Sequence, residues 1–188
     1  MSKKFTGTIK HSTESIRRLY KAAYHVYDMR QIVAKMFGGA ILAAIGILGN
    51  LPTIGQAALI MIGCWLMVSK DFPAKCAADD ALDVRKKRNQ LLPQMTTTFF
   101  ENHAELQGEG KMKLEYQRFE RLVEDDAYFY LFLRKDSACM IGKDSLHPHH
   151  CDEFKTFIAK KTGKEWREMK PWYLMSLYEI VKMFKESK

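Results

Sequence analysis

Residues 36–69 read MFGGAILAAIGILGNLPTIGQAALIMIGCWLMVS, and none of them is Asp, Glu, Lys or Arg. Asn50 and Pro52 lie near the middle of this stretch, where they favour a tight turn and the end of a helix. The apolar runs on either side, 32–48 and 53–69, would each form a helix of about 25 Å at 1.5 Å per residue. Such a helix can just cross a bilayer core. The stretch therefore predicts a transmembrane helical hairpin.

Small residues recur at a spacing of four in this stretch, as in Gly39 and Ala43 or Ala40 and Ala44. In lipid, such spacing allows the backbones of two helices to approach closely. The alternative is a buried helical hairpin in a soluble core, but helices of that kind usually keep a polar face. The length of the uncharged stretch favours the membrane.

The distribution of charge gives an orientation. The chain has 188 residues and a net charge of +8, which as a single number suggests nucleic acid. Residues 1–35, however, carry +6, residues 70–95 carry +2, and residues 96–188 are neutral. Basic residues at the ends of apolar spans are typical of the cytoplasmic side. We expect a cell-membrane protein with two spans and both termini in the cytoplasm, with the lipid bilayer and not nucleic acid as its partner.

The segments that flank the spans predict short regular elements. Residues 5–9 alternate like one short strand, and Ser12 and Ser15 then fit a capping box. We expect the basic helix that follows to run up to the bilayer. Residues 79–88 predict an amphipathic helix with an acidic start and a basic end, and the basic run 85–88 is expected to be attracted to the membrane surface.

From residue 96 onward the apolar residues alternate with a period of two, which predicts a small antiparallel sheet module. The expected strands are 96–101, 104–107, 112–116, 118–124, 128–134 and 138–141. Asp152 and Glu153 then begin a helix that ends at Gly163, a residue suited to the left-handed position after a helix. The predicted fold class is α+β: a two-helix transmembrane hairpin, a sheet module and a following α-helix.

The C-terminal tail predicts an additional amphipathic helix. Residues 171–184 leave a narrow polar stripe and a wide apolar face. Three interpretations stay open: the helix packs over the module, it lies in the membrane interface through Trp172 and Tyr173, or it docks a protein partner or a second copy of the chain.

The order of these parts, together with several aromatic motifs, resembles the YcxB-like family of small bacterial membrane proteins. The resemblance extends over about residues 3–162. The family usually has a proline where this chain has Gly142, and it lacks the histidines before the last helix. It implies a pleckstrin-homology-like sheet module and no established enzyme activity. The matching motifs are Phe99-Phe100-Glu101-Asn102, Tyr116 with Phe119 and Leu122-Val123, the strand at 128–134, and Met140-Ile141-Gly142-Lys143.

One loop contains side chains that can bind a metal. A tetrahedral zinc site could use two of the histidines and the cysteine, with a ligand from elsewhere such as His103 or Cys139. The alternative, a polar loop with an Asx cap for the next helix, is favoured because adjacent histidines rarely converge on one ion. The loop candidates are His147, His149, His150 and Cys151.

The sequence contains none of the usual catalytic motifs, and no cofactor is expected. The pair Asp125 and Asp126 is predicted to be solvated in a hairpin turn. The four cysteines show no CxxC spacing, which argues against a disulfide framework or a zinc knuckle.

We therefore divide the chain into five regions and expect a non-enzymatic bacterial inner-membrane protein that tethers a cytosolic interaction module. One alternative is a membrane-bound immunity protein that neutralises a toxin. Another is a metal-dependent enzyme that uses the histidine loop. The regions are an N-terminal strand and basic helix (1–35), the hairpin (36–69), a juxtamembrane helix and linker (70–95), the sheet module (96–163) and the C-terminal amphipathic helix (164–188).

Overall fold

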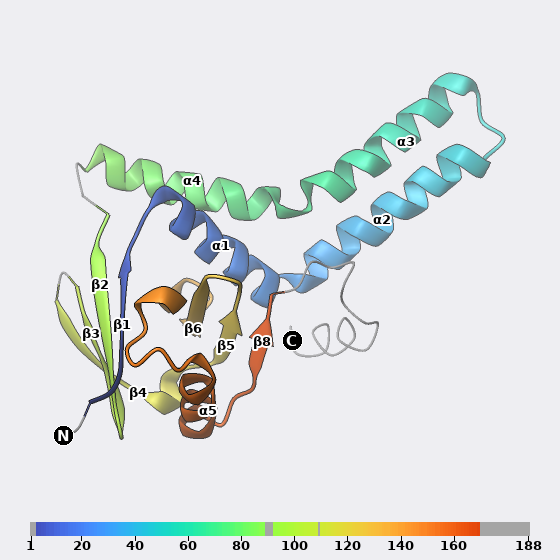
Figure 1. The fold of residues 1–188 in the computed structure, drawn as a ribbon. Coiled ribbons are helices and arrows are strands. Elements are labelled where there is room, and N and C mark those ends of the chain that lie inside the picture. The colour runs from blue at the N-terminus through green and yellow to red at the C-terminus, as the bar shows by residue number, and fades with distance from the viewer. Residues whose placement is uncertain (1–2, 89–91, 109, 170–188) are drawn as a thin grey trace.

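The computed structural model describes residues 3–88, 92–108 and 110–169. They form two four-stranded sheets together with helices, which confirms the α+β prediction (Figure 1). The first sheet has the order β1-β2-β3-β4 and is antiparallel throughout. The second has the order β7-β6-β5-β8, in which β8 runs parallel to β5. The strands are β1 (Lys3–Lys10), β2 (Gln94–Phe100), β3 (His103–Gln107), β4 (Lys111–Glu115), β5 (Arg121–Glu124), β6 (Tyr128–Arg134), β7 (Ser137–Gly142) and β8 (Trp166–Glu168).

The predicted strand at 118–124 begins later than expected. Residues Tyr116–Arg118 form a 3-10 turn (η2) instead. The Tyr116 hydroxyl donates to the backbone carbonyl of Phe100 at 2.6 Å and to that of His103 at 3.1 Å. These bonds hold the turn against the β2–β3 connection, so pairing with β6 begins only at Arg121.

Helix α5 (Cys151–Thr162) closes one end of the core between the two sheets. The Phe154 ring lies 5.1 to 5.3 Å from the rings of Phe5, Phe99 and Phe129, and is fully buried. The predicted Asx cap is wrong: the residue at the cap position is His150, with no side-chain cap bond, and Asp152 lies inside the first turn. A carboxylate in that turn still interacts favourably with the helix dipole.

Helix α1 (Thr13–Tyr27) begins at the predicted capping box. The backbone N–H of Ser15 donates to the Ser12 hydroxyl at 3.1 Å, and that of Ser12 donates to the Ser15 hydroxyl at 2.8 Å. Beyond the cap, the helix is part of the folded domain. Its residues Ala22, Ala23 and Val26 are buried in the cluster that also contains β-strand residues of the second sheet.

Three helices follow α1 and return the chain to the first sheet. They are α2 (Met29–Leu48), α3 (Thr53–Val68) and α4 (Phe72–Lys87), with a 3-10 turn, η1 (Ser69–Asp71), before the last. Helix α4 begins earlier than the predicted 79–88, because a proline follows Phe72 in its first turn, where proline is favoured. The pair α2 and α3 projects from the sheets, and α4 runs back over α1 (Figure 1).

The connection of β1 to β2 is the main topological result. The two strands pair from Lys3 and Phe100 to Lys10 and Gln94, although α1 to α4 separate them in the sequence. The helices therefore form an insertion between two neighbouring strands of one sheet. We call β1–β8 with α1 and α5 the sheet domain, and α2 with α3 the helix pair.

The structure differs from the sequence prediction at the C-terminal end. Residues Trp166–Glu168, which were assigned to the amphipathic helix, form β8 and pair with Leu122–Glu124 of β5. The Trp166 Nε1 donates to the Lys155 carbonyl of α5 at 2.9 Å, which fixes this strand beside the helix. The helix predicted at 171–184 lies outside the described residues.

Candidate functional site

The helix pair exposes most of its apolar side chains. Two helices are long and apolar enough to cross a membrane: Met29–Leu48 (α2), and Thr53–Lys87, which continues from α3 through η1 into α4. Only 17% and 6% of the residues in their most apolar windows are buried. A core helix of a soluble protein would bury most of them. Large exposed side chains are Phe37, Ile41, Ile45, Ile47, Leu48, Ile54, Met61, Ile62, Trp65 and Val68.

Glycines bring the two helices together. A Cβ on Gly63 would lie 2.5 Å from the Gly39 carbonyl oxygen and 2.8 Å from the Ala43 nitrogen. A Cβ on Gly46 would lie 2.8 Å from a side-chain carbon of Ile60. At the connecting turn, the Gln56 amide donates to the Gly49 carbonyl at 2.8 Å. Gly39 and Ala43 therefore lie on the contact face of the pair, whereas Ala40 and Ala44, the other pair at this spacing, are exposed.

The joint between the helix pair and the sheet domain consists of a polar contact and a buried apolar cluster. Asp71 of η1 accepts from His25 of α1 at 2.9 Å and lies 3.6 Å from the Lys21 Nζ. Next to it, Tyr24, Met29, Ile32 and Ala74 form a separate buried cluster. The joint thus holds α1, α2 and the start of α4 together.

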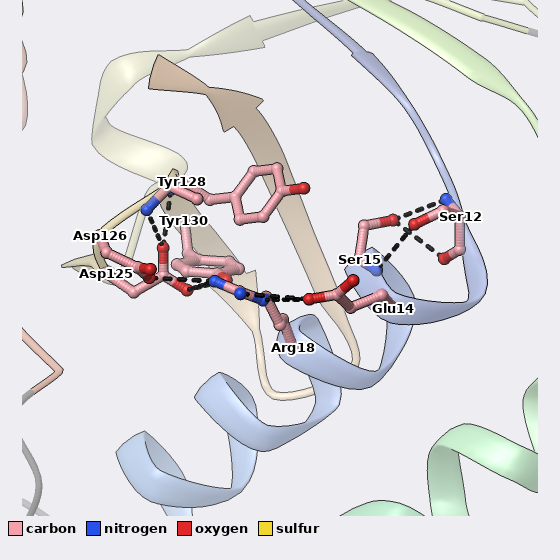
Figure 2. Close-up of polar contacts among 9 residues, drawn as sticks. Ser12, Glu14, Ser15, Arg18, Asp125, Asp126, Tyr128 and Tyr130 are labelled. Atoms are coloured by element: carbon pink, nitrogen blue, oxygen red, sulfur yellow. Dashed lines mark hydrogen bonds and ion pairs between the residues drawn. The ribbon is translucent and has the colours of Figure 1, made fainter. Parts of the chain in front are cut away.

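The pair Asp125 and Asp126 is a second polar feature (Figure 2). The Asp125 carboxylate accepts from the backbone N–H groups of Ala127 and Tyr128 and, at 2.6 Å, from the Tyr130 hydroxyl. Its side chain is only 12% exposed, so the prediction of a solvated pair is wrong for Asp125, whereas the Asp126 side chain is 80% exposed. Burial, and then the bond to Asp125, raise the pKa of Tyr130.

Arg18 of α1 ties this turn to the helix. Its guanidinium lies 2.9 Å from Asp126, 3.7 Å from Asp125 and 3.1 Å from Glu14 of its own helix (Figure 2). These contacts hold the turn at Asp125 and Asp126 against α1.

Glu124 is the most enclosed acid of the sheet domain. It is 7% exposed and accepts from the Lys143 ammonium at 2.8 Å and from the Lys155 ammonium. Burial alone would raise its pKa, but the two ammonium groups outweigh burial and lower it. This cluster could not be predicted from local sequence, because its members come from three separate elements, β5, η3 (Lys143–Ser145) and α5. They line an open cleft of about 450 Å³.

The candidate metal ligands are not brought together. His147, His149 and His150 are exposed, and the His150 Nδ1 lies 3.1 Å from the Glu153 carboxylate. The backbone of His147 pairs with Thr6, which fixes the loop to β1. Within residues 3–88, 92–108 and 110–169, no three His, Cys, Asp or Glu side chains are placed to hold a metal ion.

The remote candidates have separate structural roles. His103 is buried, stacks on Phe100 and lies 3.2 Å from Glu105. Cys139 is buried in the core, where burial raises the pKa of its thiol to about 11. Neither is placed with the histidine loop in a metal-binding group. Cys151, which is half-buried, begins α5.

A cavity of about 220 Å³ lies between α1, α4 and the β6–β7 turn, and we call it the α1–α4 cavity. His11 and Arg85 are among the residues that line it. Sequence reasoning assigned Arg85 only to a surface basic run, because nothing local shows that α4 folds back over α1. The apolar part of the wall consists of Ile16, Leu19, Ala23, Ala81, Met95, Phe132 and Ala138.

Comparisons with known proteins bear on the sheet domain. No curated protein and no solved structure matches the chain. A family model does match, over less than half of the chain: it covers the end of β2, the strands β3–β7 and most of α5. Residues 99–158 match the model described as YcxB-like protein, in agreement with the resemblance that the aromatic motifs predicted.

Proposed function

We propose that the chain is a non-enzymatic protein of the bacterial inner membrane, in which the helix pair anchors a cytosolic sheet domain that interacts with other molecules. The observation that carries this proposal is the exposed apolar surface of α2 and α3. Leaving such large apolar patches in water is unfavourable. Burial in lipid removes that cost, and the close glycine contacts suit helices that pack in lipid.

The proposed orientation rests on the charges at the ends of the helix pair. Lys35 and Lys70 flank the uncharged residues at the end that faces the sheet domain, whereas Asn50 lies in the distal turn. Lysine side chains near the ends of spans extend to the headgroups on the cytoplasmic side. The sheet domain would then lie in the cytoplasm.

The pleckstrin-homology-like character that the resemblance implies is part of the same proposal. It is supported by two sheets that share one core and are antiparallel except at β8, and by a helix, α5, that closes the end of that core. Modules of this shape serve mainly as binding platforms, which favours interaction over catalysis. This step is an analogy of fold and assigns no ligand.

Cysteine labelling tests the orientation. In a chain with Cys64 and Cys151 replaced by Ser, the exposed Cys76 on α4 reports the domain side, and Asn50→Cys reports the turn. A membrane-impermeant maleimide should label Asn50→Cys in intact cells and Cys76 only in inverted vesicles. Labelling of Cys76 in intact cells would reverse the orientation, and recovery of the chain in the soluble fraction would refute the anchor.

A further inference from the structure

The α1–α4 cavity combines an apolar wall with a histidine and an arginine that lack partners among the described residues. Its wall includes Ile16, Leu19 and Phe132, and its rim includes His11 and Arg85. The Nδ1 atom of His11 is buried and has no hydrogen-bond partner among the described residues. A buried nitrogen without a partner is costly, so such an atom calls for a ligand or a water.

Arg85 is the second group without a counterpart. Its side chain is half-buried on the cavity wall, and it forms no ion pair within the described part of the chain. The other charged groups of the wall are Lys135, whose ammonium is 2.6 Å from Asp28, and Asp136. Asp28 already compensates Lys135, and among the described residues Asp136 forms no ion pair with Arg85, so the guanidinium stays available to an anion.

The position of His11 agrees with this electrostatic character. Burial, and then the nearby guanidinium of Arg85, lower its pKa. The ring is therefore neutral at pH 7, and in the tautomer protonated on Nδ1 it donates to an acceptor. A carboxylate could accept from both His11 and Arg85.

The volume limits the size of an occupant. A cavity of about 150 Å³ holds benzene, and the α1–α4 cavity is about 220 Å³. It therefore accommodates one aromatic ring or a short alkyl chain with a small head group, and not a whole phospholipid.

We propose that the α1–α4 cavity is a binding site for a small carboxylate with an apolar body, whose head group is held by Arg85 and His11. Its apolar part contacts α1 on one side and Ala81 of α4 on the other. The ligand would thus bridge the sheet domain and the helix that leads from α3. This site does not depend on whether the helix pair spans a membrane.

Two methionines allow a local measurement on the full chain in nanodiscs. Met95 lines the cavity, whereas Met112 on β4 is 56% exposed and lies outside the cavity wall. With ¹³C-methyl methionine, titration with 3-phenylpropionate should shift the Met95 methyl signal and leave that of Met112 unchanged. The uncharged analogue 3-phenylpropanol should bind more weakly.

Substitutions on α4 separate the head-group contact from the apolar contact. Arg85→Gln should weaken 3-phenylpropionate about tenfold or more, the range expected for a charged hydrogen bond, and leave 3-phenylpropanol unchanged. Lys86→Gln, next to it but exposed, is the matched control and should have no effect. Ala81→Phe should fill the cavity and abolish the Met95 response, whereas Ala77→Phe on the exposed face of α4 should retain it.

Two results would overturn the proposal. One is the absence of any Met95 shift with 3-phenylpropionate at about 20 mM, well above a millimolar dissociation constant. The other is equal affinity in the Arg85→Gln and Lys86→Gln chains, because the head group would then not be held by Arg85. If Ala81→Phe fails to fold, the comparison of Arg85→Gln with Lys86→Gln still tests the proposal.

Discussion

Single residues decide how the sheet domain tolerates acid groups in its core. Asp125 and Glu124 are adjacent and both are largely enclosed, but their carboxylates have different kinds of partner. Asp125 is satisfied by backbone N–H groups and by Tyr130 within its own hairpin. Glu124 is satisfied by two lysines from distant elements. Both carboxylates thus have the hydrogen-bond partners that buried polar groups require.

Glu124→Gln should lower the free energy of unfolding by about 1–3 kcal/mol at pH 7, the range for hydrogen bonds to charged groups. The pKa of Glu124 is lower in the folded chain than its ordinary value of 4.5. Its contribution is therefore complete above that value and is lost as the pH falls through the folded pKa. Urea unfolding of both chains in detergent, at a series of pH values, measures the difference.

The matched control is Glu115→Gln on β4, where the side chain is exposed. That substitution should change the unfolding free energy by no more than about 0.5 kcal/mol at any pH. A gap between wild type and Glu124→Gln that is as large at pH 3 as at pH 7 would contradict the linkage to the carboxylate.

At the level of elements, local sequence patterns predicted the bounds of single helices and strands. The run 128–134, which is apolar on both faces, predicted β6 at its observed bounds, and Ser12 with Ser15 predicted the start of α1. The pairing of β1 with β2 could not be predicted, because the strands are separated by four helices and neither contains a signal for its partner. Likewise, Trp166 pairs with Leu122 in a parallel register, and no turn residue in the sequence predicts that pairing.

The position of the basic run is a second case in which tertiary structure decides. Residues 85–88 lie at the end of α4 away from α3 (Figure 1). At 1.5 Å per residue, that end is about 20 Å along the helix from its start. Arg85 turns to the α1–α4 cavity there. The attraction of this run to the membrane surface stays a prediction.

The contact face of the helix pair yields a prediction at the same scale. Gly63→Ile should destabilise the chain by about 1–3 kcal/mol, the usual cost of overpacking, because its side chain would collide with the backbone of Gly39 and Ala43. Gly38→Ile on α2 is the control, since nothing lies within 4 Å of a Cβ there. Thermal unfolding in detergent micelles compares them, and equal midpoints for the two variants would show that the glycine contact is not needed.

For the whole molecule, the insertion of the helix pair between β1 and β2 has a structural consequence. The chain leaves the sheet domain through α1 and returns through α4, and these two helices are held together by His25 with Asp71 and by Arg17 with Asp79 at 2.8 Å. The exit and the return are thus adjacent without help from α2 and α3. The sheet domain should be separable from its anchor.

Replacing residues 37–67 by a six-residue Gly/Ser linker should therefore give a folded, soluble protein. Such a linker reaches up to about 20 Å, more than the 8–10 Å between packed helices, and the buried residues Met29, Ile32 and Ala74 at the joint are retained. Ultracentrifugation should find the chain in the supernatant, and urea should unfold it in one cooperative transition.

Adding Ile9→Asp, which places a charge at a buried position of β1, should abolish that transition if β1 belongs to the same folding unit as β2. If the shortened chain aggregates, or if its unfolding transition is unchanged by Ile9→Asp, the helix pair is required to bring β1 and β2 together.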